Sequence, residues 1–401
     1  MRVDLLTREW PPHVYGGGGV HVTELAAALV RAGVGVSVRA FGADVERVAG
    51  PAVHGYPDLE PLAGANAAVR TLGVDLTMAA DVAVGAPDVV HSHTWYANLA
   101  GHLGGLLSGA PHVLTAHSLE PLRPWKAEQL GGGYRVSSWA ESAAYRGASA
   151  VIAVSAAMRR DILRSYPFVD PDRVHVVHNG VDTTAWRPSE DVSALGAAGV
   201  DPAAPSVVFV GRITRQKGLP YLLRAAAELP AEVQLVLLAG AADTPEIRAE
   251  VVGLVDGLRR SRSAPVVWID RMLPREEVRQ FLTRATVFVC PSVYEPLGIV
   301  NLEAMACGAA VVGTATGGIP EVVAPGRTGW LVPIDQVDDG SGTPVDPDRF
   351  VADLAATLVE AVSDPGRAAA LGRAGRARAQ AEFSWDAVAA RTVEVYDTVP
   401  S

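Results

Sequence analysis

Short runs rich in β-branched residues alternate along the whole chain with segments of helical periodicity, and this alternation restricts the fold more than any other feature. It is typical of parallel-sheet units, because a crossover helix connects each pair of parallel strands. Several of the runs are apolar throughout, which favours sheets covered by helices on both faces. Strands are expected at Val3–Leu6, Val34–Arg39, Val89–His91, His112–Thr115, Ala150–Val154, Val174–Val177, Val207–Val210, Val233–Ala239, Val266–Ile269, Val287–Cys290, Ala310–Gly313 and Trp330–Val332.

The strands fall into two similar halves, which predicts two doubly wound α/β domains, residues 1–190 and 203–383, facing a cleft. The segment Thr183–Pro205 is rich in Pro, Ala, Ser and Gly and is interpreted as the domain linker. Helices are expected at Val20–Ala32, Leu219–Leu229, Ile247–Arg262, Arg275–Ala285, Phe350–Val362 and Arg367–Thr398, the last with a break near Phe383-Ser384-Trp385. Because ligands of such sheets bind beyond the carboxyl ends of the strands, the chemistry is expected in the loops that follow them.

Composition excludes several other classes of protein. The 401 residues carry a net charge of −10, whereas a general nucleic-acid binder needs a basic surface. Two cysteines, Cys290 and Cys307, cannot form a disulfide framework or a four-cysteine zinc site. The uncharged stretch 89–119 contains five histidines, several glycines and Pro111, so it is too interrupted for a membrane span. Without a secretory h-region, the chain is expected to be cytoplasmic, with no membrane or nucleic-acid partner.

Two loops are suited to binding anions. Four glycines, Gly16–Gly19, follow the first predicted strand, where they allow close backbone approach and precede the free N–H groups of a helix. No complete dinucleotide-binding fingerprint occurs, and a plain glycine-rich turn is the alternative. In the second half, Arg212 and Lys217 belong to a loop between a strand and a helix. Two cations from one loop suit a leaving diphosphate, although a solvated basic loop is the alternative.

Two glutamates, Glu295 and Glu303, give the strongest signal for a site. They lie in an otherwise uncharged segment, with Gly298 between them near the start of a short helix. We expect Glu295 in the loop and only Glu303 on the helix, so that the helix N-terminus faces phosphates while each glutamate accepts hydrogen bonds from hydroxyls. A glycosidase acid/nucleophile pair is an alternative, but it leaves the two cations unexplained.

Other residues point to different classes of protein. His91 and His93 share one face of a strand and, with His117, could form a three-histidine metal site of a hydrolase. Histidines that line a sugar-binding cleft or the core are the favoured interpretation, because no acidic ligand accompanies them. The Asp-Pro-Asp segments 170–172 and 346–348 are interpreted as turn and helix-cap residues. A two-domain sugar-binding protein is the non-enzyme alternative, and it would not need the cations together with the glutamate pair.

These motifs resemble those of the retaining glycosyltransferases of family four, which have the GT-B fold. The resemblance rests on Glu295 and Glu303 with seven residues between them, on the basic loop 211–218 and on the glycine turn, and it covers essentially the whole chain. It implies a first domain that binds the acceptor and a second that binds the nucleotide sugar. It also implies that the C-terminal helix, residues 384–401, crosses back to the first domain.

Three longer motifs, Leu6–Glu9, His91–Tyr96 and Thr115–Lys126, resemble actinobacterial members of this family that act in glycogen biosynthesis. The resemblance implies a hexosyltransferase that moves glucose from ADP-glucose to the O4 of glucose-1-phosphate, giving α-maltose-1-phosphate. Elongation of an α-1,4-glucan from the same donor is the alternative. The expected partners are therefore small-molecule substrates or an α-glucan, a homodimer is left open, and no cofactor or metal is implied.

The resemblance also assigns a donor site. Arg212 and Lys217 would neutralise the diphosphate, Glu295 would hold the glucose hydroxyls, and Glu303 would bind the ribose. His117 would lie beside the donor sugar. The other implied donor contacts are Gly17, Gly18, Asp270, Arg271, Met272, Pro296, Leu297, Gly298, Ile299 and Val300. In this family, retention is attributed to attack from the face on which the phosphate leaves, so no nucleophile is named.

One departure from the family bears on the acceptor. Bacterial glycogen synthases carry a lysine two residues before their paired glycines, whereas Val14 and Tyr15 precede Gly16 here. The departure favours a small acceptor over a polymer, with its phosphate held by basic residues of the first domain. The expected acceptor contacts are Arg8, Tyr15, Trp95, Arg123 and Lys126.

Overall fold

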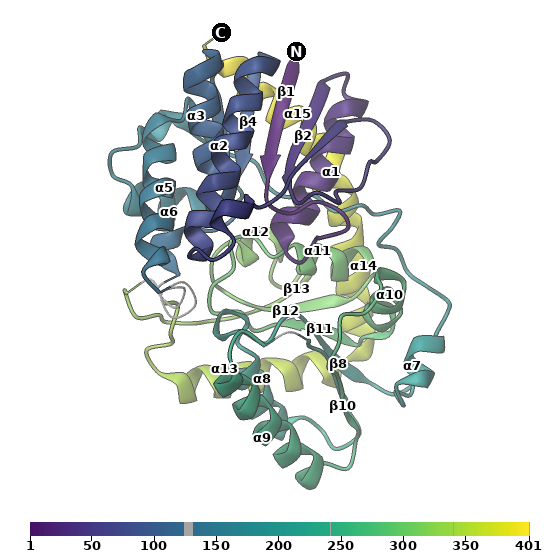
Figure 1. Cartoon of the computed structure of the whole chain (residues 1–401). Helices are drawn as coiled ribbons and strands as arrows, with labels where there is room; N and C mark the ends of the chain where they lie inside the picture. Colours follow the sequence, from purple (N-terminus) through teal and green to yellow (C-terminus); the bar gives the residue numbers. More distant parts are fainter. Residues whose placement is uncertain (124–130, 241, 340, 401) are drawn as a thin grey trace. The chain divides into compact units, whose positions relative to one another are not determined.

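The chain folds into two units, each built on a single sheet of parallel strands (Figure 1). The computed structural model describes residues 1–123, 131–240, 242–339 and 341–400. Unit 1 comprises Met1–Gly180 and Trp385–Ser401, and unit 2 comprises Val181–Ser384. The segment expected to be a linker lies within unit 2, where it forms α7 (Ser193–Ala197) and buries Leu195 and Val200. Burial of these two apolar side chains gives the segment an ordered structure although its composition is that of a loop.

The sheet of unit 1 has the order β3-β2-β1-β4-β5-β6-β7, and every described strand pair in it is parallel. The strands are β1 (Arg2–Thr7), β2 (Gly35–Phe41), β3 (Ala52–Tyr56), β4 (Val89–His93), β5 (His112–Ala116), β6 (Ala150–Ala153) and β7 (Val174–Val176). All were expected except β3, an edge strand whose residues are mostly exposed and which therefore lacks an apolar run.

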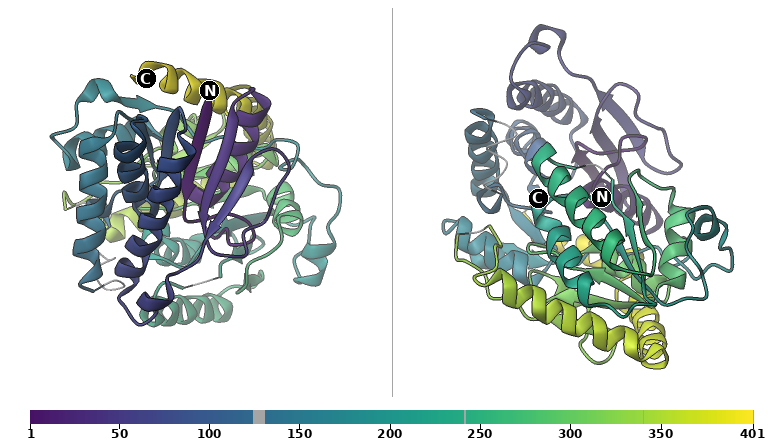
Figure 2. Two further views of the ribbon diagram at one scale, coloured as in Figure 1. Left: turned by 45° about the horizontal axis from the view of Figure 1, so that its top comes forward. Right: turned by 90° about the horizontal axis from the view of Figure 1, so that it is seen from below.

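Helices cover both faces of this sheet. On one face α1 and α15 share a core with β1 and β2, and the yellow C-terminal helix α15 lies beside α1 in Figures 1 and 2. On the other face α2 and α3 pack over Leu6 and Val90. The helices are α1 (Gly17–Arg31), α2 (Ala67–Gly85), α3 (Trp95–Ser108), α5 (Gly133–Gly147), α6 (Ala156–Ser165) and α15 (Trp385–Thr398). The expected return of the C-terminal helix to the first domain is thus confirmed, and an ion pair of 2.7 Å between Arg31 and Asp386 accompanies it.

The sheet of unit 2 has the order β10-β9-β8-β11-β12-β13, again with parallel pairs. The strands are β8 (Ser206–Val210), β9 (Gln234–Leu238), β10 (Val266–Ile269), β11 (Val287–Cys290), β12 (Ala310–Thr314) and β13 (Gly329–Val332). The helices are α7, α8 (Leu219–Ala225), α9 (Pro245–Ser261), α10 (Arg275–Arg284), α11 (Ile299–Ala306), α12 (Ile319–Val322), α13 (Pro347–Ser363) and α14 (Pro365–Glu382). Helices α8, α9 and α13 bury one face of the sheet, while α14 contacts β12 and packs against α11, which also contacts α10.

None of the helices in the described part of the chain combines the length and the apolar character needed to cross a membrane.

Candidate active site

In both units the candidate residues follow the carboxyl ends of strands, as expected for open parallel sheets. In unit 1, Arg8 follows β1, His93 ends β4 and His117 follows β5. In unit 2, Lys217 lies in the loop after β8, and Glu295 lies in the loop after β11. The strand order places β1 beside β4, and β8 beside β11, which gathers these loops at one edge of each sheet.

Lys217 and Glu295 form the polar centre of unit 2. The Nζ of Lys217 lies 2.7 Å from Oε2 of Glu295, which also accepts a hydrogen bond of 3.1 Å from Ser292. The Glu295 side chain is 8% exposed and that of Lys217 is 24% exposed, so solvent screens the pair weakly. Burial acts to lower the pKa of Lys217, but attraction to Glu295 outweighs it and raises that pKa above its usual value. The ammonium is therefore charged at neutral pH.

Gly218 brings the lysine loop against the loop that carries Glu295. It has a φ of 66°, in the left-handed region that glycine tolerates, and a Cβ at this position would overlap the carbonyl oxygen of Pro291. The two loops are also joined by a hydrogen bond of 2.9 Å from the Val293 amide to the Gln216 carbonyl. A side chain at position 218 would therefore force these two loops apart.

We expect Gly218→Ala to lower the free energy of unfolding by about 2–4 kcal/mol, from the left-handed conformation and the overlap together. Urea unfolding would measure it. The control is Gly253→Ala in α9, where a Cβ meets nothing within 4 Å and alanine should stabilise the helix by about 0.5–1 kcal/mol. Equal effects at the two glycines would contradict this account of the loop.

The second glutamate lies on α11, and Glu295 precedes that helix, as expected. Gly298 caps α11 with a φ of 89°, and the first turn contains no acidic residue. Burial raises the pKa of Glu303 to about 7, while Arg275 and Lys217 act to lower it. Asn301, which the sequence reasoning missed, is fully buried beneath Gly298, and neither polar atom of its amide has a hydrogen-bond partner among the described residues.

Three other residues predicted to bind the donor have ion-pair partners of their own in unit 2. The Nη1 of Arg212 lies 3.0 Å from Oδ1 of Asp243, and Arg212 is close enough to Lys217 to affect its pKa. In the loop expected to flank a base, Asp270 is paired with Arg248 at 3.1 Å, and Arg271 lies 3.5 Å from Glu277. Met272 is exposed. Arg212 and Lys217 are therefore neighbours, but only Lys217 is directed at Glu295.

The glycine turn of unit 1 is anchored by Glu9, another residue that the sequence reasoning missed. The Glu9 carboxylate accepts hydrogen bonds from the amides of Tyr15 (3.0 Å) and Gly16 (2.7 Å). A Cβ on Gly19 would lie 2.6 Å from the Cβ of Glu9. At Gly18, a Cβ would be 3.9 Å from the ring of His117. The turn is thus packed tightly against Glu9 and opens toward His117.

Three histidines of unit 1 gather beside this turn, and they are not the three that the sequence suggested. His91 is held structurally, 2.7 Å from the Tyr396 hydroxyl and 2.7 Å from Thr115 Oγ1. The cluster instead comprises His21, His93 and His117, with His21 supplied by α1. His21 was not predicted from the sequence, because it lies within α1 and not at the end of a strand. Burial lowers the pKa of His21 to about 4 and places the pKa of His93 and His117 well below the usual value.

The backbone beside this cluster is strained. Thr94, between His93 and α3, has a φ of 63°, a conformation that a β-branched residue rarely adopts. Such strain concentrates at functional sites, where the surrounding structure holds it in place. The strain at Thr94 therefore supports a functional role for the residues at the carboxyl end of β4.

The predicted acceptor residues have mixed surroundings. Arg8 lies over the Tyr96 ring, 4.3 Å from its centroid, and Tyr15 is exposed. Trp95 is only 2% exposed, so its ring is buried with α3 and presents little surface to an acceptor. Arg123 donates to Ser118 at 3.1 Å and lies 4.0 Å from buried Glu120. Lys126 lies outside the described residues.

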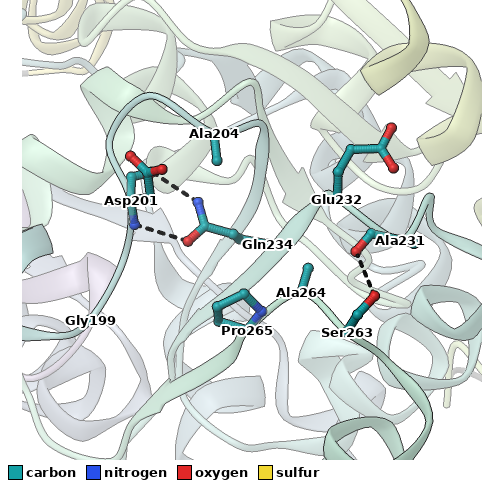
Figure 3. Close-up of a pocket in the computed structure, with 9 residues that line it drawn as sticks. All are labelled: Gly199, Asp201, Ala204, Ala231, Glu232, Gln234, Ser263, Ala264 and Pro265. Atoms are coloured by element: carbon teal, nitrogen blue, oxygen red, sulfur yellow. Dashed lines mark hydrogen bonds between the residues drawn. The ribbon is translucent and has the colours of Figure 1, made fainter.

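A shallow cavity of about 360 Å³ in unit 2 lies elsewhere (Figure 3). Its polar centre is a pair of hydrogen bonds of 2.9 Å between Asp201 and Gln234, and Gln234 begins β9. The cavity therefore adjoins the amino ends of the strands, the edge opposite to Lys217 and Glu295. Its lining contains no histidine, cysteine, lysine or arginine and so offers no cluster suited to catalysis.

Two family models match the chain and divide it as the two sheets do. Residues 15–185 match the model described as Glycosyltransferase Family 4, and residues 204–343 match the model described as Glycosyl transferases group 1.

Relatives match over the whole length. The chain is 56% identical to the alpha-maltose-1-phosphate synthase of Mycolicibacterium smegmatis and 54% identical to that of Mycobacterium tuberculosis H37Rv, covering 100% of both chains in each case. It is 31% identical to D-inositol 3-phosphate glycosyltransferase 1 of Catenulispora acidiphila, over 95% of this chain and 90% of that one.

Solved structures agree on the fold. Sucrose-phosphate synthase from Thermosynechococcus elongatus has a TM-score of 0.77 at 25% identity, covering 99% of this chain and 98% of that one. The catalytic domain of Starch Synthase IV from Arabidopsis thaliana has a TM-score of 0.76 at 19% identity, covering 98% of each chain. The expected fold of two Rossmann-like domains is thereby confirmed.

Proposed function

The chain belongs to the family 4 glycosyltransferases and has the GT-B fold, and from this premise we propose that it transfers glucose from ADP-glucose to O4 of glucose-1-phosphate, forming α-maltose-1-phosphate. The identity of 54–56% to alpha-maltose-1-phosphate synthases over full length carries this proposal. The donor nucleotide rests on the resemblance of the motifs to actinobacterial enzymes of glycogen biosynthesis.

The Lys217–Glu295 pair supports a donor site in unit 2. An ammonium has three N–H donors, and one of them is directed at Glu295, so Lys217 can hold a phosphate oxygen and the glutamate together. Arg212 would add a second positive charge for the diphosphate. The negative charge that develops on the leaving diphosphate would be stabilised by these cations and by the amides at the start of α11.

Glu295 would accept hydrogen bonds from hydroxyls of the donor glucose, which orients the sugar relative to the cations. We assign the transfer retention of configuration. The acceptor O4 forms its bond to the anomeric carbon on the face from which the diphosphate departs, and a phosphate oxygen takes the O4 proton. No protein nucleophile is needed, and His117 beside the sugar would act as a neutral imidazole because burial lowers its pKa.

Arg8 is the strongest candidate for the acceptor phosphate. It lies at the carboxyl end of β1 over the ring of Tyr96, and it makes no ion pair with a carboxylate in the described ranges of the chain. Arg123 is already engaged by Ser118 and Glu120. Among the five acceptor residues predicted from the sequence, we therefore rank Arg8 and Tyr15 as the strongest candidates for contact with the acceptor. Arg123 and Lys126 rank below them.

The test is an assay with ADP-glucose and, separately, glucose-1-phosphate, free glucose or glycogen, with EDTA present. ADP release and product mass are followed together. A disaccharide phosphate formed much faster than labelled polymer is the expected result, and free glucose should react poorly because it lacks the phosphate. Faster labelling of glycogen would overturn the acceptor assignment. A preference for UDP-glucose would overturn the donor assignment alone.

Glu303 gives a prediction about pH. If its carboxylate binds the ribose, ADP should bind more tightly as the pH rises from about 6 to 8, because the ionised form accepts stronger hydrogen bonds and its pKa is raised to about 7. The phosphates of ADP also titrate near pH 6. The measurement is therefore the difference between wild type and Glu303→Gln in ADP affinity by calorimetry. An identical pH dependence in both proteins would remove Glu303 from the nucleotide site.

A further inference from the structure

We propose that His21, His93 and His117 form a binding site for a divalent transition metal such as Zn²⁺, at which metal binding inhibits the enzyme. All three lie in unit 1, and each offers one ring nitrogen such that these atoms lie within 4.8 Å of one another. Imidazole nitrogen is a preferred ligand of Zn²⁺, and three histidines with one open position are a recurrent donor set. This inference goes beyond the proposed glycosyl transfer, to which we assign no metal.

The spacing of the nitrogens supports coordination. His93 Nδ1 and His117 Nε2 are 3.2 Å apart. Two nitrogens that bind one tetrahedral Zn²⁺ at 2.0–2.1 Å are separated by about 3.3 Å, so this pair is already placed for a shared ion. At present the contact is a hydrogen bond. Metal binding requires that its proton move to the far nitrogen of the donating ring, which leaves both imidazoles neutral and releases no proton.

His21 is oriented as metal-binding histidines commonly are. Its Nδ1–H donates to Oδ1 of Asn179 at 2.8 Å, which fixes the tautomer and leaves the lone pair on Nε2. That Nε2 is buried and has no hydrogen-bond partner among the described residues. Trp385 packs against the ring, with centroids 5.4 Å apart. A buried nitrogen without a partner is costly, and a metal ion would satisfy it.

The three histidines can bind an ion without a change in charge, and an ion can reach them from solvent. A neutral imidazole is the form that binds a metal, and the hydrogen bond between His93 and His117 requires that one of these two rings already present an unprotonated nitrogen. His117 is only partly buried, and Gly18 opposite it carries no side chain, which leaves room for an ion to enter. The open coordination position would be filled by water.

Inhibition follows if His117 lies beside the donor sugar, and this consequence alone rests on the proposed function. An ion held by His117 would occupy the space of the sugar. Zn²⁺ should then inhibit transfer, and EDTA should restore it. Binding itself is measured without any assay of transfer, so its failure can be distinguished from failure of the proposed function.

The experiment is a titration of the metal-free protein with Co²⁺, read by its visible ligand-field bands, and with Zn²⁺ by calorimetry. We expect one ion per chain and a Zn²⁺ dissociation constant of about 1 μM or below. His21→Ala should abolish the Co²⁺ bands. Asn179→Leu, which leaves all three ligands in place, should weaken binding about 10-fold. Circular dichroism would verify that the variants are folded.

The control is His13→Gln. His13 and Asp44 form an exposed pair at 2.9 Å that could bind an ion on the surface. Unchanged binding in this variant, together with loss in His21→Ala, supports the proposal. Binding that disappears with His13→Gln and survives His21→Ala overturns it. Failure of wild type to bind Zn²⁺ at about 100 μM overturns it as well.

Discussion

Glu295→Gln is expected to lower kcat by about 100-fold or more while the protein remains folded. In the proposed mechanism, Glu295 orients both the donor glucose and the ammonium of Lys217. Glutamine keeps the size of the side chain and a hydrogen bond to Ser292, but it removes the charge that attracts Lys217 from 2.7 Å. Losing one preorganised electrostatic partner typically costs about 10²–10³ in rate. Steady-state kinetics with ADP-glucose would measure it.

The control for this variant is Glu228→Gln, an exposed carboxylate of the same unit. It should leave kcat unchanged. Removing one member of a buried ion pair leaves the other charge without compensation, so Glu295→Gln should also lower the Tm. For this reason the assay is done well below the Tm, with circular dichroism as the check. Near-wild-type turnover by folded Glu295→Gln would remove Glu295 from the mechanism.

The fold was largely predictable because its strands are buried between helices. Continuous apolar runs such as Val207–Val210 and Val287–Cys290 predict such strands directly, and the structure confirms them within a residue or two. β3 was missed because an exposed edge strand needs no apolar run. The segment 183–205 shows the opposite case, since it has the composition of a loop but contains α7 and two buried aliphatic residues.

The candidate site was predictable where chemistry follows the end of a strand, and less so where it depends on long-range packing. Lys217 and Glu295 were both identified, but not their ion pair, because they are 78 residues apart and meet only when β8 and β11 become neighbours. His21 and Asn179 are 158 residues apart. Glu9, in contrast, could have been predicted from the sequence. It lies between a strand and a glycine turn, and the backbone amides of such a turn need a hydrogen-bond acceptor.

The Lys217–Glu295 ion pair is difficult to explain by stability alone. A buried ion pair is weak evidence for stability, because desolvation of both charges offsets their attraction. The presence of this ion pair in the loops of unit 2 is therefore better explained by function than by folding. That difference can be measured, because stability and activity should respond differently when the two charges are removed separately and together.

Lys217→Met is expected to lower kcat/KM by about 100-fold and to raise the ADP inhibition constant by about 10-fold or more. A hydrogen bond from a charged donor is worth about 1.5–3 kcal/mol, which corresponds to this range. Methionine keeps most of the length of the side chain. The single variant should also be destabilised by about 3 kcal/mol or more, because it leaves the Glu295 carboxylate buried without its partner.

The double variant Lys217→Met/Glu295→Gln separates the two effects. With neither charge buried, its free energy of unfolding should recover most of what Lys217→Met loses, since residues in direct contact are not additive. Its activity should remain as low as that of the weaker single variant, because the groups proposed to contact diphosphate and glucose are both gone. Urea unfolding and steady-state kinetics on the four proteins complete the cycle. If activity returned together with stability, the pair would be a structural element, and the cation that stabilises the leaving group would have to be sought at Arg212.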